Sequence, residues 1–482
     1  MAAWKLSRNS SQATPIRRHK SPMNPRIAAL AGLLLAALVV PLPAPAQHPP
    51  TFLDYLGVDL ANGPIQSDLS DLAPFTHMEI GGVAVTVDAL PKGLKNHSDL
   101  GVVMPDWIDV RVIHRFPQPD VGDYRGPYPP VTYVDCPRPV ITPQGDYLLT
   151  IIAGKFHYLM VDPHRKVNDI LIYRSKDKGA TWQGPFLSTA IAYNQHAWVP
   201  LVPKGGQRIY MFSTEPAPGD FNGVENAGIG FRFSDDDGYS WSNVTRIRPV
   251  NDPGFQGMWC INMTETGEGT WLLAPHESDQ AIHHTLLYVL RSADKGRTWE
   301  LLPGKRPQGW RDIHEGRPIA LGGGKVVLFA RTHEGYIAQL RSEDDGQTWS
   351  DPRPTALVHP DAPPMIEKLS DGKTLIALHH NRLPGSGFKH QGHAEDRSEL
   401  WVSLSKDGGL SWTEPRFLAV TSSRTTRPIF GTEWYCLTYC DVLADAGNLH
   451  IFIPHLWRQV LEVRMKEQDL LRLPTRADLF GK

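Results

Sequence analysis

Ser175-Lys-Asp-Lys-Gly-Ala-Thr-Trp182 is the stretch that decides the fold, because its pattern returns four more times along the 482 residues. Each copy reads Ser-x-Asp-x-Gly-x-(Thr or Ser)-Trp. The Asp can accept hydrogen bonds from backbone amides of a tight turn, the Gly can adopt a positive φ, and the Trp can cover the turn. The pattern therefore predicts a β-hairpin turn at each copy. The five copies begin at Ser175, Ser234, Ser292, Ser342 and Ser405.

The spacing of these copies defines the repeat. Successive copies lie 59, 58, 50 and 63 residues apart, and each follows an apolar or alternating stretch. That period suits one four-stranded sheet per repeat and is too long for a flat β-solenoid. We therefore expect an all-β, six-bladed β-propeller over residues 126–482, with five blades that carry the octapeptide and a sixth that lacks it. Residues 47–125 are expected to form an N-terminal segment that closes the propeller.

The N-terminus predicts export. A basic stretch precedes an apolar run of 14 residues, 27–40, and Ala44 and Ala46 fit a small-x-small cleavage site. The run is too short to cross a bilayer comfortably and suits a signal peptide over residues 1–46. We expect a secreted or periplasmic protein with no integral membrane segment after cleavage. The net charge of −2 argues against nucleic acid as a partner.

The four cysteines do not indicate a disulfide scaffold or a metal site. Four thiols in so long a chain are interpreted as core groups or as one bridge. The CxxxC spacing lacks the further His or Cys ligands of a zinc site, and no EF-hand-like calcium loop is present. We expect neither a metal nor a cofactor. The cysteines are Cys136, Cys260, Cys436 and Cys440.

Three arginines begin or end predicted strands: Arg138, Arg331 and Arg397. An arginine at the end of an apolar strand is costly unless it meets an anion. If the three converge on the propeller axis, they could bind a carboxylate with bidentate geometry. Taken singly, each is also explained by a surface salt bridge. Arg382, in His379-His-Asn-Arg, is a rival for the third position.

Together these features resemble the bacterial exo-sialidases (neuraminidases), in which the octapeptide is known as the Asp-box or BNR repeat. Arg138-Pro, followed by Thr-Pro-x-Gly, resembles the Arg-Ile-Pro motif that opens the family's first blade. Glu315 stands 16 residues before Arg331, which resembles the layout around the family's second arginine. Arg397 stands eight residues before Ser405, as the family's third arginine stands before an Asp-box.

The resemblance, which covers about residues 130–455, also implies catalytic roles. Asp162 would be the acid, with Asp169 as second candidate. Tyr439 would be the nucleophile, with Tyr435 as second candidate, and Glu315 would be its base partner. Sialic acid carries a carboxylate on its anomeric carbon, which would repel a carboxylate nucleophile, so a neutral tyrosine suits it better. The implied reaction is retaining hydrolysis, and the implied partner is a sialylated or other acidic glycan.

Some residues depart from the family pattern and keep other functions open. The first motif lacks its Ile, Tyr439 is followed by Cys, and the segments expected near the axis are rich in histidine. One alternative is a polysaccharide lyase or other carbohydrate-active enzyme for an acidic sugar. In a lyase, arginine would neutralise a uronate while His or Tyr removes the C5 proton. The other alternative is a non-catalytic glycan-binding propeller.

Overall fold

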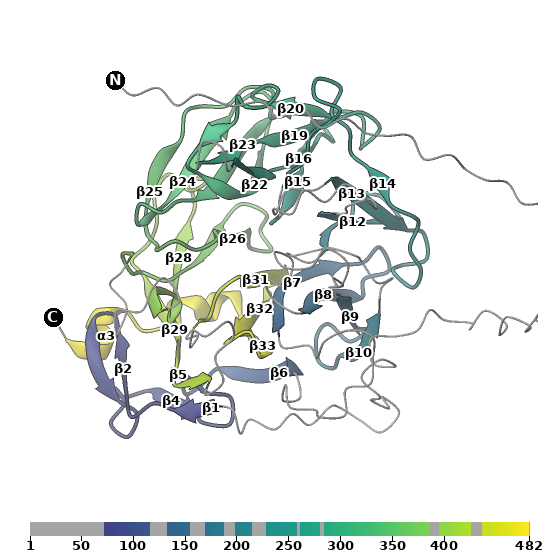
Figure 1. Cartoon of the computed structure of the whole chain (residues 1–482). Coiled ribbons are helices and arrows are strands. Elements are labelled where there is room, and N and C mark those ends of the chain that lie inside the picture. The colour runs from purple at the N-terminus through teal and green to yellow at the C-terminus, as the bar shows by residue number, and fades with distance from the viewer. Residues whose placement is uncertain are drawn as a thin grey trace, which may run out of the picture. The chain divides into compact units, whose positions relative to one another are not determined.

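Figure 1 shows a computed structural model of the chain, in which strands dominate. The structure describes residues 72–115, 133–154, 169–187, 198–214, 228–257, 261–279, 284–384, 395–425 and 436–481. All of them belong to one compact unit, residues 51–482. The proposed signal peptide lies outside the described residues. No helix in the described ranges is long and apolar enough to span a membrane.

Three antiparallel sheets of four strands follow one another in the first half of the propeller. In each sheet, strands that are consecutive along the chain lie side by side, apart from one insertion in the third sheet. The first sheet holds β7 (Tyr133–Ile141), β8 (Tyr147–Gly154), β9 (Asp169–Ser175) and β10 (Gln183–Leu187). The second holds β11 (Val199–Leu201), β12 (Ile209–Thr214), β13 (Ile229–Ser234) and β14 (Thr245–Arg246). The third holds β15 (Met263–Glu265), β16 (Trp271–Leu273), β19 (Val289–Ser292) and β20 (Glu300–Leu302).

Three further sheets complete the series, and two of them recruit strands from the N-terminal segment. The fourth holds β22 (His314–Gly322), β23 (Lys325–Arg331), β24 (Tyr336–Ser342) and β25 (Arg353–Val358). The fifth holds β26 (Met365–Lys368), β27 (Leu375–His379), β28 (Glu399–Ser405) and β29 (Arg416–Thr421), and β5 (Val102–Pro105) and β4 (Leu94–His97) extend it. The sixth holds β31 (Asp441–Asp445), β32 (Asn448–His455), β33 (Gln459–Lys466) and β6 (Asp109–Arg115).

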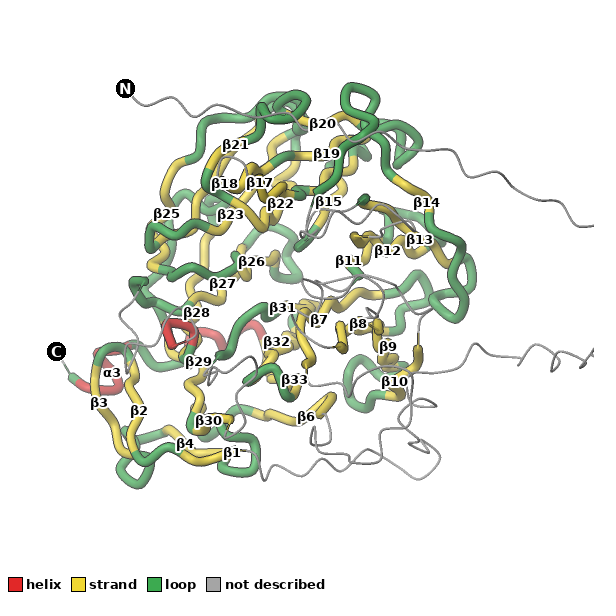
Figure 2. Tube along the Cα trace, in the orientation of Figure 1, coloured by secondary structure: helices red, strands yellow, loops and turns green. Residues whose placement is uncertain are grey.

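Small elements decorate these sheets (Figure 2). The two strands inserted in the third sheet pair with a later strand to form a three-stranded sheet next to β22. It consists of β17 (His276–Asp279), β18 (His284–Leu287) and β21 (Trp310–Arg311). Two two-stranded sheets pair β1 (Leu72–Pro74) with β30 (Ser423–Thr425) and β2 (His77–Ile80) with β3 (Val83–Thr86). The described helical elements are η3 (Glu395–Arg397), η4 (Glu467–Arg472) and α3 (Arg476–Phe480).

The first strands of the sheets line a common centre, as Figure 1 shows. Strand β7 lies beside β11, β11 beside β15, β15 beside β22, β26 beside β31, and β31 again beside β7. Apolar side chains fill the spaces between neighbouring sheets. Phe212 of the second sheet, for example, packs against Trp271 of the third. This arrangement confirms the predicted all-β propeller, and it places the starts of the inner strands around one axis.

The octapeptides form the predicted turns after the third strand of the first five sheets. In the first copy, Ser175 donates from Oγ to Asp177 Oδ1 at 2.8 Å and accepts from the Gly179 amide at 2.8 Å. Asp177 also accepts from the Thr181 amide at 2.8 Å. The same serine and aspartate hydrogen bonds recur in the other four copies. These aspartates therefore stabilise turns.

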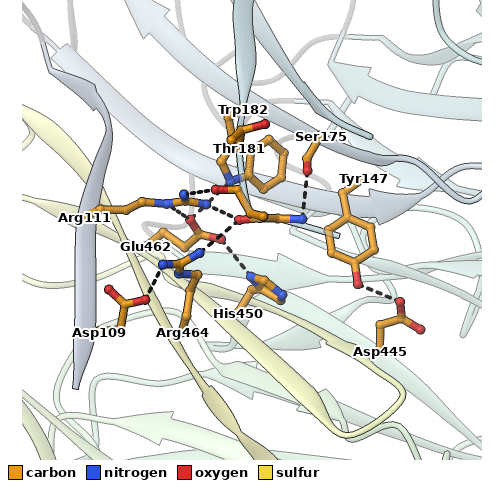
Figure 3. A network of polar contacts seen from close by, with 12 residues as sticks. Asp109, Arg111, Tyr147, Ser175, Thr181, Trp182, Asp445, His450, Glu462 and Arg464 are labelled. Atoms are coloured by element: carbon orange, nitrogen blue, oxygen red, sulfur yellow. Dashed lines mark hydrogen bonds and ion pairs between the residues drawn. The ribbon is translucent and has the colours of Figure 1, made fainter. Parts of the chain in front are cut away.

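Strand β6 joins the last sheet to the first, although it precedes both along the chain. It pairs antiparallel with β33 and so forms the outer edge of the sixth sheet. Figure 3 shows the side chains at this junction. Arg111 of β6 donates to Glu462 at 2.6 Å and to the main-chain oxygen of Ala180, in the first octapeptide turn, at 2.6 Å. Glu462 also contacts His450 at 2.8 Å and accepts from Trp182 Nε1 at 3.2 Å.

Candidate active site

Three predicted site residues meet near the propeller axis. Tyr439, which precedes β31, donates its hydroxyl to Glu315 Oε1 of β22 at 2.8 Å. Arg331, the last residue of β23, donates from Nη1 to Glu315 Oε2 at 3.0 Å and to the Tyr439 hydroxyl at 3.4 Å. The three side chains are buried, and Glu315 is wholly so. A tyrosine, a carboxylate and a guanidinium from three strand ends therefore form one hydrogen-bonded group.

An unusual backbone conformation directs two of these side chains. Glu315 has a φ of 49° and Tyr439 a φ of 58°, in the left-handed region that few residues other than glycine adopt. In β22 the pairing with β23 shifts register between His314 and Arg317, which is a bulge around Glu315. Cys136 in β7 has a φ of 48° and also lies at a register shift. Such backbone irregularities gather at functional sites, where they re-aim side chains.

The electrostatic surroundings keep the tyrosine protonated. Burial raises the pKa of the Tyr439 phenol well above its ordinary value, and the neighbouring Glu315 raises it further. The charges of Arg331 and Arg397 act in the opposite direction without cancelling this rise. Burial, the largest single influence, lowers the pKa of Arg331, but Glu315, Tyr439 and Asp361 together outweigh it and the net pKa is raised. At neutral pH the hydroxyl is thus a neutral donor beside an acceptor that can take its proton.

Asp361, which the sequence did not single out, links two of the predicted arginines. It lies between β25 and β26 and accepts from Arg331 Nε at Oδ1, at 2.5 Å. Arg397 donates to its main-chain oxygen. Burial would raise the pKa of Asp361, but a hydrogen bond from His333 and the two guanidiniums hold it well below its usual value. Arg331 and Arg397 therefore meet at one ionised residue.

Arg138 lies with a different carboxylate. Its Nη1 is 3.2 Å from Asp441 Oδ2, and Arg317 Nη2 is 2.5 Å from Asp441 Oδ1. Both arginines and Asp441 are buried, and they come from the first, fourth and sixth sheets. The structure thus brings Arg331 and Arg397 together at one residue, Asp361, and places Arg138 at another, Asp441. A role of Arg138 in binding the substrate stays a prediction.

The remaining candidates lie elsewhere or outside the described residues. Asp162, the predicted acid, lies outside the described residues, as does Tyr435. The second candidate for the acid, Asp169, begins β9. Arg382, the rival third arginine, is buried and forms an ion pair of 2.6 Å with the buried Glu399. That pairing indicates a structural function for Arg382.

Three histidines form a row beside the tyrosine–glutamate pair. The ring centroids of His276 and His314 are 5.3 Å apart, and those of His314 and His333 are also 5.3 Å apart. His276 Nδ1 accepts from the Glu315 amide at 3.3 Å. Burial lowers the pKa of His276 to about 3 and that of His314 well below its usual value. The hydrogen bond to Asp361 raises the pKa of the half-exposed His333.

A cation could geometrically reach part of this row. Ligand atoms of His314, His333 and Asp361 lie within 4.8 Å of one another. However, Asp361 already pairs with Arg331, and Arg397 approaches its main-chain oxygen. Two guanidiniums at the only anionic member of the group oppose a divalent ion there. The charges therefore suit an anion near these arginines better than a metal.

The described cysteines are free thiols rather than a bridge. Cys136, Cys436 and Cys440 are buried and unbridged, which agrees with the interpretation of core thiols. Cys136 donates to Asp135 Oδ2 at 3.3 Å. Burial raises the pKa of the Cys136 and Cys440 thiols well above their usual value. Cys260 lies outside the described residues.

Comparisons with known proteins agree with the family resemblance and with the fold. A family model described as the BNR repeat-like domain matches residues 165–451. The anhydrosialidase of Macrobdella decora is 25% identical over 192 residues, which are 38% of this chain and 24% of that protein. The chain thus matches about a quarter of the length of this curated relative. These matches confirm the resemblance to the sialidase and BNR-repeat family.

Solved structures share the fold at low sequence identity. The Hadza microbial sialidase Hz136 has 20% identity and a TM-score of 0.52 over 70% of this chain and 66% of that chain. The Trypanosoma rangeli sialidase in complex with the inhibitor DANA has 14% identity and a TM-score of 0.51, over 77% of this chain and 61% of that chain. At such identities the likeness concerns the fold alone.

Proposed function

The chain belongs to the BNR repeat-like domain family, and from this premise we propose that it is a sialidase-type glycoside hydrolase. More narrowly, we propose an exo-α-sialidase that removes terminal sialic acid from glycoconjugates with retention. One observation carries the proposal: the buried hydrogen bond of 2.8 Å from the Tyr439 hydroxyl to Glu315, with Arg331 bound to both. A tyrosine in that setting is equipped to act as a nucleophile.

The proposed first step uses this pair directly. The Tyr439 oxygen attacks the anomeric carbon, and its proton passes to Glu315 along the existing hydrogen bond. The glycosidic bond breaks as Asp162 protonates the leaving oxygen. Arg331 donates to both members of the pair, so it can stabilise the negative charge that grows on the phenolic oxygen. The products of this step are a tyrosyl glycoside and the freed aglycone.

The proposed second step restores the enzyme. Asp162, now ionised, removes a proton from water, which attacks the anomeric carbon on the face that the aglycone left. The tyrosine departs and recovers its proton from Glu315. Two displacements at one carbon give net retention. In both steps we propose that the substrate carboxylate binds Arg331 and Arg397, with Arg138 as the third ligand.

A second candidate is a lyase for an acidic sugar, and one observation favours it. His314 is buried beside Arg331, and its Nδ1 has no hydrogen-bond partner among the described residues. A neutral imidazole near an arginine could remove the C5 proton of a uronate whose carboxylate is neutralised. The non-catalytic alternative, glycan binding without turnover, remains an outcome of the experiment below. We also propose export through residues 1–46.

The test compares two tyrosines that each donate to a carboxylate. The wild type should release the fluorophore from an α-sialoside, and Y439F should lose at least about a hundredfold in kcat/KM. The matched control is Y147F, because the Tyr147 hydroxyl donates to Asp445 at 2.6 Å in the junction between the first and sixth sheets (Figure 3). Y147F should retain its rate on the sialoside.

The outcomes separate the candidate functions. NMR should detect the α-anomer of the free sugar first if hydrolysis retains configuration. An unsaturated uronate from acidic polysaccharides, with no sugar released from any sialoside, would assign the protein to the lyases instead. Binding of glycans with no product of either kind would leave a non-catalytic propeller.

A further inference from the structure

Some N–H donors of the Arg331 guanidinium bond to the protein, and the others have no partner among the described residues. Its Nε bonds to Asp361, and its Nη1 bonds to Glu315 and to the Tyr439 hydroxyl. Its Nη2 has no hydrogen-bond partner in the described part of the chain. The protein thus uses three of the five N–H donors to fix this guanidinium and leaves one nitrogen to meet a ligand.

Arg397 shows the same division. One terminal nitrogen donates to the main-chain oxygen of Asp361. Its Nε is buried and has no partner among the described residues. The side chain is almost wholly buried, so a guanidinium with unused donors here is costly unless an anion reaches it. Its charge also acts on Tyr439, which places it within electrostatic reach of that hydroxyl.

Asp361 meets the two arginines with two different oxygens. The side-chain oxygen holds Arg331 of the fourth sheet, and the main-chain oxygen holds Arg397, which precedes β28 of the fifth sheet. Asp361 itself lies in the connection between these sheets. Its carboxylate is largely buried and is also 3.2 Å from His333 Nδ1. One residue therefore spans the gap between two neighbouring blades.

We propose that Asp361 is a positioning residue that sets the spacing and orientation of Arg331 and Arg397 for an anionic group of the substrate. This inference rests on the proposed function and deepens it. Asp361 occupies Nε of Arg331 and a terminal nitrogen of Arg397, so the remaining donors of both guanidiniums are held in fixed directions. The substrate carboxylate binds those remaining donors and does not displace Asp361.

Electrostatic repulsion explains why a further residue is needed to hold Arg331 and Arg397 at a fixed spacing. Two guanidiniums repel each other, and burial strengthens that repulsion. The carboxylate of Asp361 offsets the repulsion and restricts the rotamer of Arg331, while the main-chain oxygen of the same residue holds Arg397. Without it, Arg331 can turn away from Glu315 and Tyr439, and a displacement of about 1 Å in such a group can cost about a hundredfold in rate.

The experiment removes the carboxylate and then supplies a small one. D361A should lose about ten- to a hundredfold in kcat/KM on the fluorogenic sialoside. Sodium formate should restore part of this rate, because formate fits the space that the carboxylate left. D361N keeps an oxygen that can accept from Arg331, so its kcat/KM should lie between wild type and D361A. The control is D371A, which removes a carboxylate that only bonds to amides and a hydroxyl of its own turn.

A binding measurement makes the inference independent of turnover. Formate should raise the melting temperature of D361A more than those of the wild type and D371A. Rescue by formate is a response that a merely structural loss would not give. If the wild type cleaves no sialoside, the proposed function fails, and the thermal measurement alone decides the role of Asp361.

Two results would overturn the inference. One is a loss of less than about threefold in D361A, which would show that the arginines keep their places without the carboxylate. The other is a D361A variant that formate neither stabilises nor reactivates beyond the wild type. If D361A does not fold, the kcat/KM of D361N tests the inference instead. A kcat/KM equal to that of the wild type would then overturn the inference, because the neutral amide holds Arg331 less firmly.

Discussion

Replacing Asp441 with alanine should destabilise the protein far more than replacing either arginine that it binds. Asp441 accepts from Arg138 at 3.2 Å and from Arg317 at 2.5 Å, and all three side chains are buried. D441A leaves Arg138 without this carboxylate, while Arg317 keeps Glu367 at 3.1 Å. Breaking a buried pair so that a charge stays behind costs about 3–5 kcal/mol.

The variant R138M tests the same reasoning, because it removes the arginine and keeps the carboxylate. R138M removes a charge but leaves Asp441 paired with Arg317, so no buried charge is left unpaired. We expect R138M to cost less than about 2 kcal/mol. The surface pair of Arg472 and Asp469 gives the reference, because exposed pairs contribute about 0–1 kcal/mol.

Urea denaturation followed by tryptophan fluorescence measures these differences. The midpoint for D441A should fall clearly below those for R138M and D469A. The reasoning would be refuted if D441A and R138M lost equal stability, or if D441A stayed within about 1 kcal/mol of the wild type. The same variants inform the predicted role of Arg138, since a substrate ligand should raise KM in R138M without a large loss of stability.

Two further predictions concern pH. Hydrogen bonds from Thr181, chiefly from its hydroxyl, lower the pKa of Asp177 to about 2. Its contribution to stability is therefore present above the unfolded pKa of about 4 and is lost as the pH falls toward 2. D177A should lower the melting temperature at pH 7 but not near pH 2, whereas D351A, at an exposed aspartate, should change little at either pH. The pKa of His333 is raised by Asp361, so its contribution is fully present below the unfolded pKa of about 6.5 and is lost as the pH rises through the folded pKa. The loss of melting temperature in H333A should be greater at pH 5.5 than at pH 8.5, and the opposite order would contradict the assigned contact.

The octapeptide turns were predictable because their determinants are local. In each copy the serine, aspartate and glycine that bond to one another lie within five consecutive residues, so the pattern carries the geometry. Because this local pattern recurs along the chain, it also predicted the fold class. Glu315 and Arg331 could also be predicted as site residues, since they lie on neighbouring strands and are 16 residues apart. Pairing such strands antiparallel brings their ends together.

The partners of the arginines were not predictable in the same way. Asp441 meets Arg138 across a separation of 303 residues, and only closure of the ring brings them into contact. Asp361 lies in a connection with no repeat or periodicity, 30 residues after Arg331. No short pattern marks either carboxylate, because their importance arises from the packing of different sheets. The sequence therefore predicted charged residues near the axis but not which charges pair.

The pairing of β6 with β33 ties assembly of the ring to the order of synthesis. Arg111 and its partner Glu462 are 351 residues apart, and closing a loop of that length costs about 5 kcal/mol of chain entropy. Strand β6 therefore cannot pair with β33 until nearly the whole polypeptide has been synthesised. A fragment that stops before Gln459 leaves β6 without its neighbour, and one that starts after Arg115 exposes the edge of β33 to other chains. Truncation at either end should thus favour aggregation over a smaller soluble propeller.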